Sequence, residues 1–318
     1  MQADVIGIQK RKGFKLQGLG SVIGLLLIIV VLSVTADNFL SVDNLLNVLR
    51  QVSINALIAF GMTFVILTGG IDLSVGSILA LSSAVAAGLM AGGTDTWIAV
   101  IAGLGAGMLM GAINGALVAK GRLAPFIVTL ATMTVFRGFT LVYTDGRPIT
   151  GLNKDFAAFG KGYFLQIPMP IIWMVIAFAV LYIVLKHTTF GRRVYAIGSN
   201  EEATWLSGIS TSKVKIMVYS ISGLLAAVSG IILTSRLNSA QPTAGASYEL
   251  DAIAAVVLGG TSLSGGRGRI VGTLIGAVII GVLDNGLNLL NVSSFYQQVV
   301  KGAVILIAVL FDRSKKRK

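Results

Sequence analysis

The sequence has 318 residues, with no cysteine and a single histidine, His187. It therefore cannot form a disulfide, use a thiolate, or build a metal site from several histidines. Charged residues make up only 12% of the chain, whereas soluble domains carry about 25%. Apolar residues make up 55%, and the mean hydropathy is +0.86. This composition excludes an ordinary soluble domain and indicates a protein built for the lipid bilayer.

Motifs of enzymes and of voltage sensors are also missing. No G-x-x-x-x-G-K-[ST] run is present to cradle phosphates. The single histidine falls at the end of an apolar run, where it cannot serve a Ser-His-Asp triad. No row of arginines marks a voltage sensor. We therefore expect no enzyme, no catalytic residue, no metal and no cofactor bound by this chain.

Apolar runs fill most of the chain, and a membrane span needs about 20 such residues. The sequence predicts an all-α polytopic membrane protein with about ten transmembrane helices, at 19–36, 46–68, 74–91, 97–118, 124–143, 169–185, 213–235, 249–261, 270–290 and 297–312. The eighth run is too short to cross alone, so it is either half of a helix or wrongly bounded. No soluble domain or proline-rich linker interrupts the pattern, so residues 1–318 should form a single transmembrane domain.

Positive charge is distributed unevenly between the two sides of these spans. The chain carries a net charge of +12. With the N-terminus in the cytoplasm, 18 of the 25 Lys and Arg residues face the cytoplasm, as the positive-inside rule requires. This predicts a cytoplasmic N-terminal tail (1–18), a cytoplasmic loop (186–215) and a cytoplasmic basic tail (313–318). The segment 144–168 becomes the longest external loop. The basic N-terminus lacks a clear signal-peptide cleavage site, which favours a retained first helix.

The loop 186–215 has the signals of a short ordered helix. Ser199 and Glu202 have the spacing of a capping box, and Gly208 suits a helix C-terminus. We therefore predict a two-turn helix over about 200–207, which carries Ala203, Trp205 and Leu206. A short exposed helix with a tryptophan is a candidate docking site. The alternative is a capped connector that packs on its own helices.

Glycine recurs in two informative patterns. In the fourth span Gly103, Gly107, Gly111 and Gly115 are spaced by four residues, which leaves one helix face free for a close neighbour. Residues 69–76 (GGIDLSVG) also resemble residues 259–266 (GGTSLSGG). The Gly pairs Gly69-Gly70 and Gly259-Gly260 suggest broken helices that expose backbone groups to a cavity. The two segments are parallel in this topology, so they form either a structural repeat with a miscounted span or a recurring local motif.

Polar side chains within and beside the spans are candidates for a translocation pathway, because polar groups at membrane depth usually face a bundle interior or water. These candidates are Asn55, Asp72, Ser74, Asn114, Ser262, Ser264, Asp284, Asn285 and Asn288. Asp284 and Asn288 should share one helix face. For the asparagines the alternative is interhelical hydrogen bonding.

Several segments resemble a known family. Glu202-Ala203-Thr204, followed after three residues by Gly208, resembles the Glu-Ala-Ala-x-x-x-Gly loop of ABC importer permeases, with Thr204 in place of the second alanine. The runs LTGGIDLSVGS (67–77), SAQPTAG (239–245) and YELDAIAAVVLGGTSL (248–263) are similar to those of the monosaccharide (ribose-type) permeases. The likeness extends over about 40–312.

The resemblance implies the permease subunit of an ATP-driven sugar importer in the bacterial inner membrane. It implies a second permease copy, a cytoplasmic ATPase with two fused nucleotide-binding halves that uses ATP-Mg, and an external sugar-binding protein. It also implies that the 186–215 loop is a coupling loop, with Ser199, Glu202, Ala203, Trp205, Leu206 and Gly208 at the ATPase. Ribose is the expected cargo, although members of the family also carry xylose, arabinose, galactose and a furanosyl signalling compound.

Two other functions compete with this expectation. An ion-coupled secondary carrier would use Asp72 and Asp284 as coupling groups, although no chain of acidic residues runs through the spans. A membrane scaffold would not transport anything.

Overall fold

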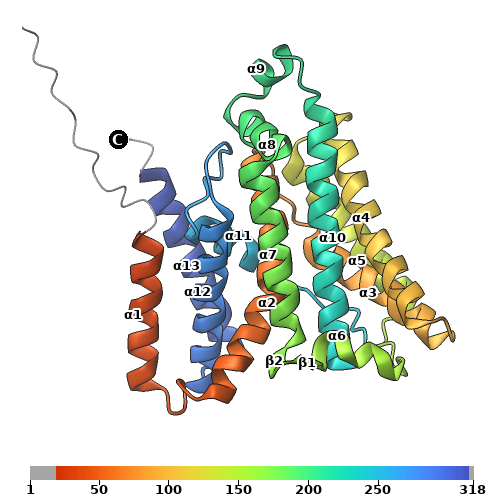
Figure 1. Cartoon of the computed structure of the whole chain (residues 1–318), viewed down its shortest axis with the longest axis vertical. Helices are drawn as coiled ribbons and strands as arrows, with labels where there is room; N and C mark the ends of the chain where they lie inside the picture. Colours follow the sequence, from red (N-terminus) through yellow and green to blue (C-terminus); the bar gives the residue numbers. More distant parts are fainter. Residues whose placement is uncertain (1–18, 315–318) are drawn as a thin grey trace, which may run out of the picture.

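The computed structural model describes residues 19–314, which are predominantly helical (Figure 1). The long helices are α1 (Leu19–Thr35), α2 (Val42–Leu67), α3 (Val75–Ala91), α4 (Thr96–Ala119), α5 (Pro125–Thr144), α7 (Met169–His187), α10 (Thr211–Leu237), α12 (Ile270–Leu289) and α13 (Ser294–Ser314). The shorter elements are η1 (Lys154–Phe156), α6 (Ala157–Lys161), β1 (Tyr163–Phe164), β2 (Ile167–Pro168), α8 (Thr189–Ser199), α9 (Glu201–Leu206) and α11 (Tyr248–Leu258). The predicted tail 1–18 and the last four residues of the tail 313–318 lie outside the described residues.

Each of the ten predicted spans coincides with one helix, namely α1 to α5, α7 and α10 to α13. Among the described residues, six of these helices are long and apolar enough to cross a membrane: α2, α4, α5, α7, α10 and α12. The all-α prediction is therefore confirmed, with six candidate spans accompanied by shorter apolar helices. The predicted bounds of the eighth run were too wide, because α11 has 11 residues and is about 17 Å long. That length covers about half of a hydrocarbon core roughly 30 Å thick.

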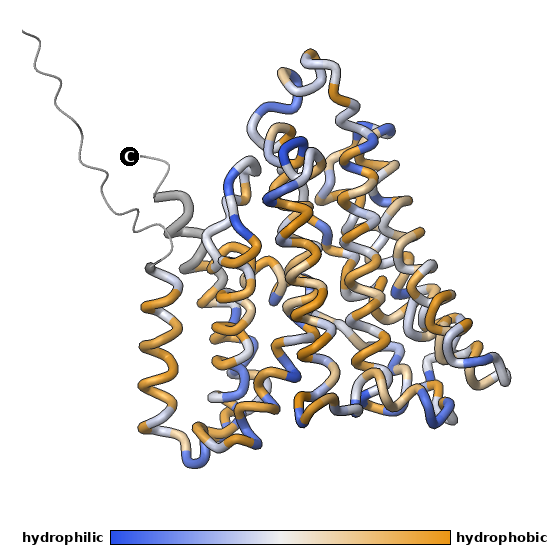
Figure 2. Tube along the Cα trace, in the orientation of Figure 1, coloured by the Kyte–Doolittle hydropathy of each residue, from blue (hydrophilic) through white to orange (hydrophobic). Residues whose placement is uncertain are grey.

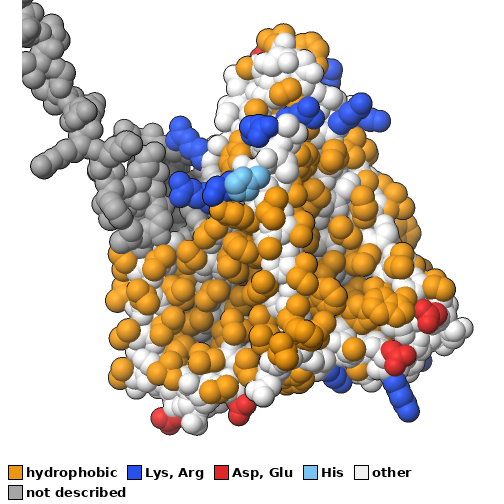
Figure 3. All heavy atoms as spheres, in the orientation of Figure 1, with side chains coloured by type: hydrophobic (Ala, Val, Ile, Leu, Met, Phe, Trp, Pro, Cys, Tyr) orange, Lys and Arg blue, Asp and Glu red, His pale blue; other side chains and the backbone are white. Residues whose placement is uncertain are grey.

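The long helices run alongside one another, and the short elements other than α11 gather at two opposite ends (Figure 1). We call the end with α8 and α9 the α9 end, and the end with α6 and the β1–β2 hairpin the hairpin end. Apolar residues cover the helices between these ends (Figure 2). On the face shown in Figure 3, Lys and Arg side chains concentrate toward the α9 end. An apolar girdle between two polar ends is the surface that a bilayer requires.

Helices α2 and α10 form the centre of the bundle, and both are mostly buried. The predicted glycine face of α4 packs directly against α10. A Cβ atom added to Gly111 would lie 2.2 Å from the carbonyl oxygen of Tyr219 in α10. No side chain fits in that space, so the prediction that these glycines are packing positions is confirmed.

The chain re-enters the bundle between α10 and α11. At the hairpin end, Ala240 pairs with Ile149 of the segment that follows α5. Gly245, five residues after Ala240, lies against the first turn of α3. A Cβ atom added to Gly76 in that turn would lie 2.1 Å from the carbonyl oxygen of Gly245. Arg137 of α5 donates to the carbonyl oxygens of Pro242 and Ala244, at 2.7 and 2.8 Å. Irregular backbone at membrane depth needs such partners, and this segment lets α11 begin inside the bundle.

The hairpin end contains structure where the sequence predicted only a loop. Strands β1 and β2 pair antiparallel, and their turn residues Leu165 and Gln166 have φ values of +48° and +67°. Two such residues form the turn that suits the twist of a two-residue hairpin. The Asn-Gly or Asp-Gly signal for this turn is missing here, and the neighbouring elements are too short to show a periodic pattern.

Candidate functional site

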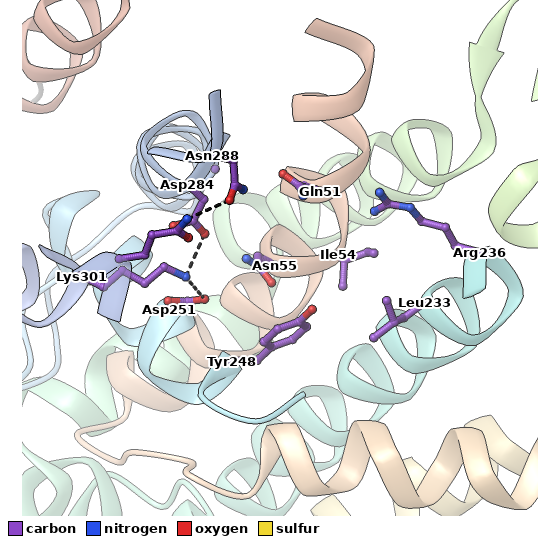
Figure 4. A pocket seen from close by; sticks show the side chains of 12 residues that line it. Gln51, Ile54, Asn55, Leu233, Arg236, Tyr248, Asp251, Asp284, Asn288 and Lys301 are labelled. Atoms are coloured by element: carbon purple, nitrogen blue, oxygen red, sulfur yellow. Dashed lines mark hydrogen bonds and ion pairs between the residues drawn. The ribbon is translucent and has the colours of Figure 1, made fainter. Parts of the chain in front are cut away.

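A polar cavity of about 180 Å³ opens between five helices near the hairpin end (Figure 4). It lies beside the last turns of α10 and the first turn of α11. Its walls come from α2 (Gln51, Ile54, Asn55), α10 (Leu233, Arg236), α11 (Tyr248, Asp251), α12 (Gly281, Asp284, Asn288) and α13 (Gln297, Lys301). Most of these side chains can donate or accept hydrogen bonds. The cavity therefore suits a polar ligand inside an otherwise apolar bundle.

An ion cluster joins three of the walls of this cavity. Nζ of Lys301 lies 2.9 Å from Oδ2 of Asp284 and 3.2 Å from Oδ2 of Asp251. The three side chains are only 7 to 24% exposed. Because buried charges are costly unless they are paired, this cluster, which we call the Asp-Lys-Asp cluster, links α11, α12 and α13.

The amide side chains beside the cluster leave hydrogen-bonding capacity in the cavity. Nε2 of Gln297 donates to Oδ1 of Asn288 at 2.8 Å, and Asn55 and Gln51 face the same space from α2 (Figure 4). Oδ1 of Asp284 is buried and has no hydrogen-bond partner among the described residues. A buried acceptor without a partner is uncommon in native proteins, so this oxygen is an unused hydrogen-bond acceptor in the cavity wall.

The structure brings together three of the predicted pathway residues, Asn55, Asp284 and Asn288, in this cavity. Asn285 lies elsewhere and exchanges two hydrogen bonds with Asn44 of α2, at 3.0 and 2.8 Å. For Asn285 the geometry matches the alternative of interhelical hydrogen bonding.

Asp72, Ser74 and Asn114 form a second buried polar cluster, apart from the cavity. Oδ1 of Asp72 accepts from the backbone N–H and the hydroxyl of Ser74, at 3.1 and 2.6 Å, and Oδ2 accepts from Ser222 of α10 at 2.9 Å. Nδ2 of Asn114 donates to the Ser74 hydroxyl at 2.7 Å. Burial raises the pKa of the Asp72 carboxyl, and the hydrogen bonds from Ser74 and Ser222 oppose that shift. The cluster ties the α2–α3 connection to α4 and α10.

The two similar glycine segments lie side by side toward the α9 end. Gly69 and Gly260 have φ values of +81° and +84° and end α2 and α11. Each forms a Schellman turn, in which Gly70 N–H bonds Val65 and Thr261 N–H bonds Val256, both at 3.1 Å. The left-handed glycine is the first of its pair in one segment and the second in the other.

Beyond these glycines the two segments match again. Asp72 accepts from Ser74 N–H at 3.1 Å, and Ser262 accepts from Ser264 N–H at 3.4 Å. Gly266 N–H donates to the carbonyl oxygen of Leu67 at 3.0 Å, which brings the two segments into contact. Both follow helices that run in the same direction, as the predicted parallel arrangement requires.

At the α9 end, the predicted helix exists but its N-terminal cap was assigned wrongly. Helix α9 spans Glu201–Leu206, and its cap is Asn200, whose Oδ1 accepts from the Ala203 N–H at 2.9 Å. The hydroxyl of Ser199 donates instead to Tyr195 within α8. The 186–215 loop contains two helices, and Ser199 ends the first of them, so it cannot cap the second.

The C-terminal prediction for α9 is confirmed. Gly208 has a φ of +81°, and its N–H and that of Ile209 complete a Schellman turn with Trp205 and Thr204, at 2.9 and 3.4 Å. Trp205 and Leu206 are 64% and 71% exposed. These two side chains form an apolar surface that the bundle leaves uncovered.

Helix α8 connects this end to the helices of the cavity. The Tyr195 hydroxyl donates to the carbonyl oxygen of Gly268, 2.9 Å away, in the α11–α12 connection. Burial raises the pKa of this hydroxyl, which keeps it protonated as a donor. A Cβ on Gly198 would lie 1.7 Å from the carbonyl oxygen of Leu67, so α8 also packs on the end of α2.

Sequence reasoning missed several residues of the cavity, among them Gln51, Arg236, Tyr248, Asp251, Gln297 and Lys301. A signal for Lys301 was available, because a lone lysine within an apolar span marks a paired or functional position. Asp251 stands in the first turn of the short apolar run and carries the same signal.

Comparisons with known proteins identify relatives of the whole chain. The family described as "Branched-chain amino acid transport system / permease component" matches residues 44–309. The ribose import permease protein RbsC of Bacillus subtilis is 66% identical over 311 residues, which cover 96% of this chain and 97% of that protein. RbsC of Escherichia coli K12 is 56% identical over 300 residues (93% and 94%). The D-allose transport system permease protein AlsC of Escherichia coli is 43% identical over 282 residues (88% and 86%). No solved structure matches significantly.

Proposed function

This chain belongs to the family of permease components described for branched-chain amino acid transport systems, and on that premise we propose that it is the membrane subunit of an ATP-driven, binding-protein-dependent ribose importer. As a permease component it is a transport subunit and not an enzyme. The ion-coupled carrier expected as an alternative, with Asp72 and Asp284 as coupling groups, is wrong, because the family is of the ABC permease type. A scaffold without transport is excluded for the same reason.

Ribose is the proposed cargo because the two relatives named for ribose share more residues with this chain than the D-allose relative does. The observation that carries this proposal is the polar cavity, lined by amides, carboxylates and cations. A sugar hydroxyl both donates and accepts hydrogen bonds, and these side chains supply both kinds of partner. The cavity would exchange the hydration shell of the sugar for protein hydrogen bonds during its passage.

We propose a bacterial inner-membrane topology with ten helical segments, in which α11 is a half-helix and the breaks lie near Gly69-Gly70 and Gly259-Gly260. The whole chain forms one permease domain. Both termini and the α9 end face the cytoplasm, and the hairpin end faces outward. The bias of 18 in 25 Lys and Arg residues supports this orientation.

The proposed partners are a second permease copy, a cytoplasmic ATPase with two fused nucleotide-binding halves, and an external sugar-binding protein. The exposed apolar surface of Trp205 and Leu206 supports an ATPase contact at the α9 end, because tryptophan is enriched among the residues that anchor protein interfaces. Glu202, Ala203 and Gly208 complete the proposed coupling helix. The ATPase, which uses ATP-Mg, supplies the energy.

The other predicted polar residues have proposed roles around the route. Asp72, Ser74 and Asn114 would hold the α2–α3 connection against α4 and α10 while the helices move. Ser262 and Ser264 would do the same for the α11–α12 connection, and Asn285 would clamp α12 to α2. Only Asn55, Asp284 and Asn288 are proposed to contact the sugar.

Uptake of ribose into proteoliposomes tests this proposal. The permease is reconstituted with the ATPase and the binding protein, with ATP inside the vesicles, where the cytoplasmic face is turned to the ATP. We expect uptake that requires ATP, the binding protein and this chain. Uptake that persists without ATP and follows an imposed ion gradient would contradict the proposal.

A further inference from the structure

We infer that the Asp-Lys-Asp cluster recognises a pair of adjacent hydroxyl groups on the sugar, with Lys301 as donor and Asp284 as acceptor. This inference rests on the proposed import of ribose and goes beyond it, because it assigns the atoms that select the cargo. The cluster is the only group of three charged side chains in mutual contact among the described residues.

The cluster has unused hydrogen-bonding capacity on two neighbouring groups. An ammonium group has three N–H donors, and that of Lys301 contacts two carboxylates, at 2.9 and 3.2 Å. The third N–H has no partner among the described residues. Oδ1 of Asp284, on the carboxylate that Lys301 contacts, is likewise without a partner. One donor and one acceptor therefore stand side by side.

This arrangement matches two hydroxyls on neighbouring carbon atoms. One hydroxyl oxygen accepts from Lys301, and the next hydroxyl donates to Oδ1 of Asp284. Both hydrogen bonds involve a charged partner, and such bonds are stronger than bonds between neutral groups. The amides of Asn288 and Asn55, in the same cavity, can contact the remaining hydroxyls.

The charges around the cavity further define the cargo. The carboxylates of Asp251 and Asp284 balance the positive charges of Lys301 and Arg236, which also line it. A neutral polyol gains hydrogen bonds there without leaving a charge unpaired. A phosphorylated sugar would bring extra negative charge beside Asp284, which like charges disfavour. The expected ligand is therefore an unphosphorylated sugar with an intact vicinal diol.

A structural brace that only holds α11, α12 and α13 together is the competing explanation. The absence of cysteine from the sequence allows a test that does not depend on the binding protein. A single cysteine at Gln51→Cys, in the cavity wall, reports occupancy through its rate of reaction with a small polar thiol reagent. Leu233→Cys, in the wall that α10 contributes, is a second reporter. Asp37→Cys, exposed in the α1–α2 turn, is the control for reactivity.

The experiment measures how ribose and 2-deoxyribose slow these reactions in the permease assembled with its ATPase and without the binding protein. We expect ribose to protect the cavity cysteines and not Asp37→Cys, and 2-deoxyribose to protect about tenfold more weakly, which corresponds to about 1.4 kcal/mol. Asp284→Asn and Lys301→Gln should each weaken protection by ribose about tenfold and reduce the preference for ribose over 2-deoxyribose. Asn285→Ala, the adjacent position turned toward Asn44, should preserve both effects.

Two results would overturn the inference. The first is that ribose does not protect the cavity cysteines in an importer that takes up ribose. The second is that Asp284→Asn and Lys301→Gln retain the full protection and preference while the melting temperature falls, as a brace alone would cause. If the unmodified importer fails to take up ribose with its partners and ATP, the proposed function fails instead, and the two failures remain distinguishable.

Discussion

Replacing Lys301 by methionine should destabilise the bundle strongly, because it removes the ammonium group and leaves two carboxylates without a cation. Asp251 and Asp284 would remain as carboxylates, 7% and 18% exposed, without their shared cation. Removing one partner from a buried ion pair costs about 3–5 kcal/mol. Methionine keeps most of the length and packing of the lysine stem, so the loss of stability reports the removal of the charge rather than a change in side-chain volume.

The same reasoning predicts a rescue. Asp251→Asn and Asp284→Asn together remove the carboxylates that Lys301→Met leaves unpaired, so the triple variant should regain most of the lost stability. Lys215→Met is a matched control, because Lys215 pairs at 2.6 Å with Glu201, whose side chain is 48% exposed. Exposed ion pairs contribute about 0–1 kcal/mol to stability, so the stability of Lys215→Met should remain close to that of the original protein.

The assay is unfolding of the purified permease in mixed micelles, followed by far-UV circular dichroism as the denaturing detergent increases. We expect Lys301→Met to shift the midpoint to lower detergent, and the triple variant to shift it back. A midpoint for Lys301→Met equal to that of Lys215→Met would refute the idea that this ion cluster holds α11, α12 and α13 together. A triple variant less stable than the single one would refute the assignment of the loss to unpaired carboxylates.

Three further predictions concern the rest of the molecule. Gly208→Val places a β-branched residue at a φ of +81°, at a strain of about 1–2 kcal/mol. Membrane insertion should persist while co-purification of the ATPase and uptake fall, and Asn200→Ala, which loses a cap worth about 1 kcal/mol, should act in the same direction. Normal ATPase binding in Gly208→Val would make α9 an ordinary connector. Asp72→Ala should lower uptake more than Asp72→Asn, because asparagine can still accept from Ser74, and equal uptake by both assembled variants would remove Asp72 from the mechanism. Protease added outside intact cells should cut a site inserted near Lys154 and spare the 186–215 loop, and cleavage of that loop would reverse the topology.

Long apolar runs were the part of the structure that the sequence predicted best. Every predicted span coincides with a helix, because a run of about 20 apolar residues has few other stable structures. The glycine face of α4 was also predictable, since a spacing of four residues defines one side of a helix. The short run at 249–261 was ambiguous because only the re-entrant segment before it shows where α11 begins.

The site was predicted less completely, for a physical reason. Asp284 and Asn288 could be paired from their spacing on one helix, but Asp251 and Lys301 reach them from other helices. Contacts between helices depend on rotation and tilt, which a single sequence does not encode locally. The prediction of the N-cap of α9 failed for a similar reason. Ser199 and Asn200 are both good N-cap residues, and only the end of α8 at Ser199 decides between them.

Helix α10 is one continuous element that connects the two ends of the molecule. It begins three residues after Gly208, runs for 27 residues, or about 40 Å, and ends beside the cavity at Arg236. On the way its Ser222 contacts Asp72 and its Ser229 contacts the backbone of Ile54. It has no proline, and its two Ser-Gly pairs, the other usual site of a kink, are held by close packing of Gly223 on α4 and of Gly230 on α3. A tilt of a few degrees imposed at Thr211 would displace Arg236 by an ångström or more, so the polar cavity can respond to events at the α9 end without a relay of small local changes.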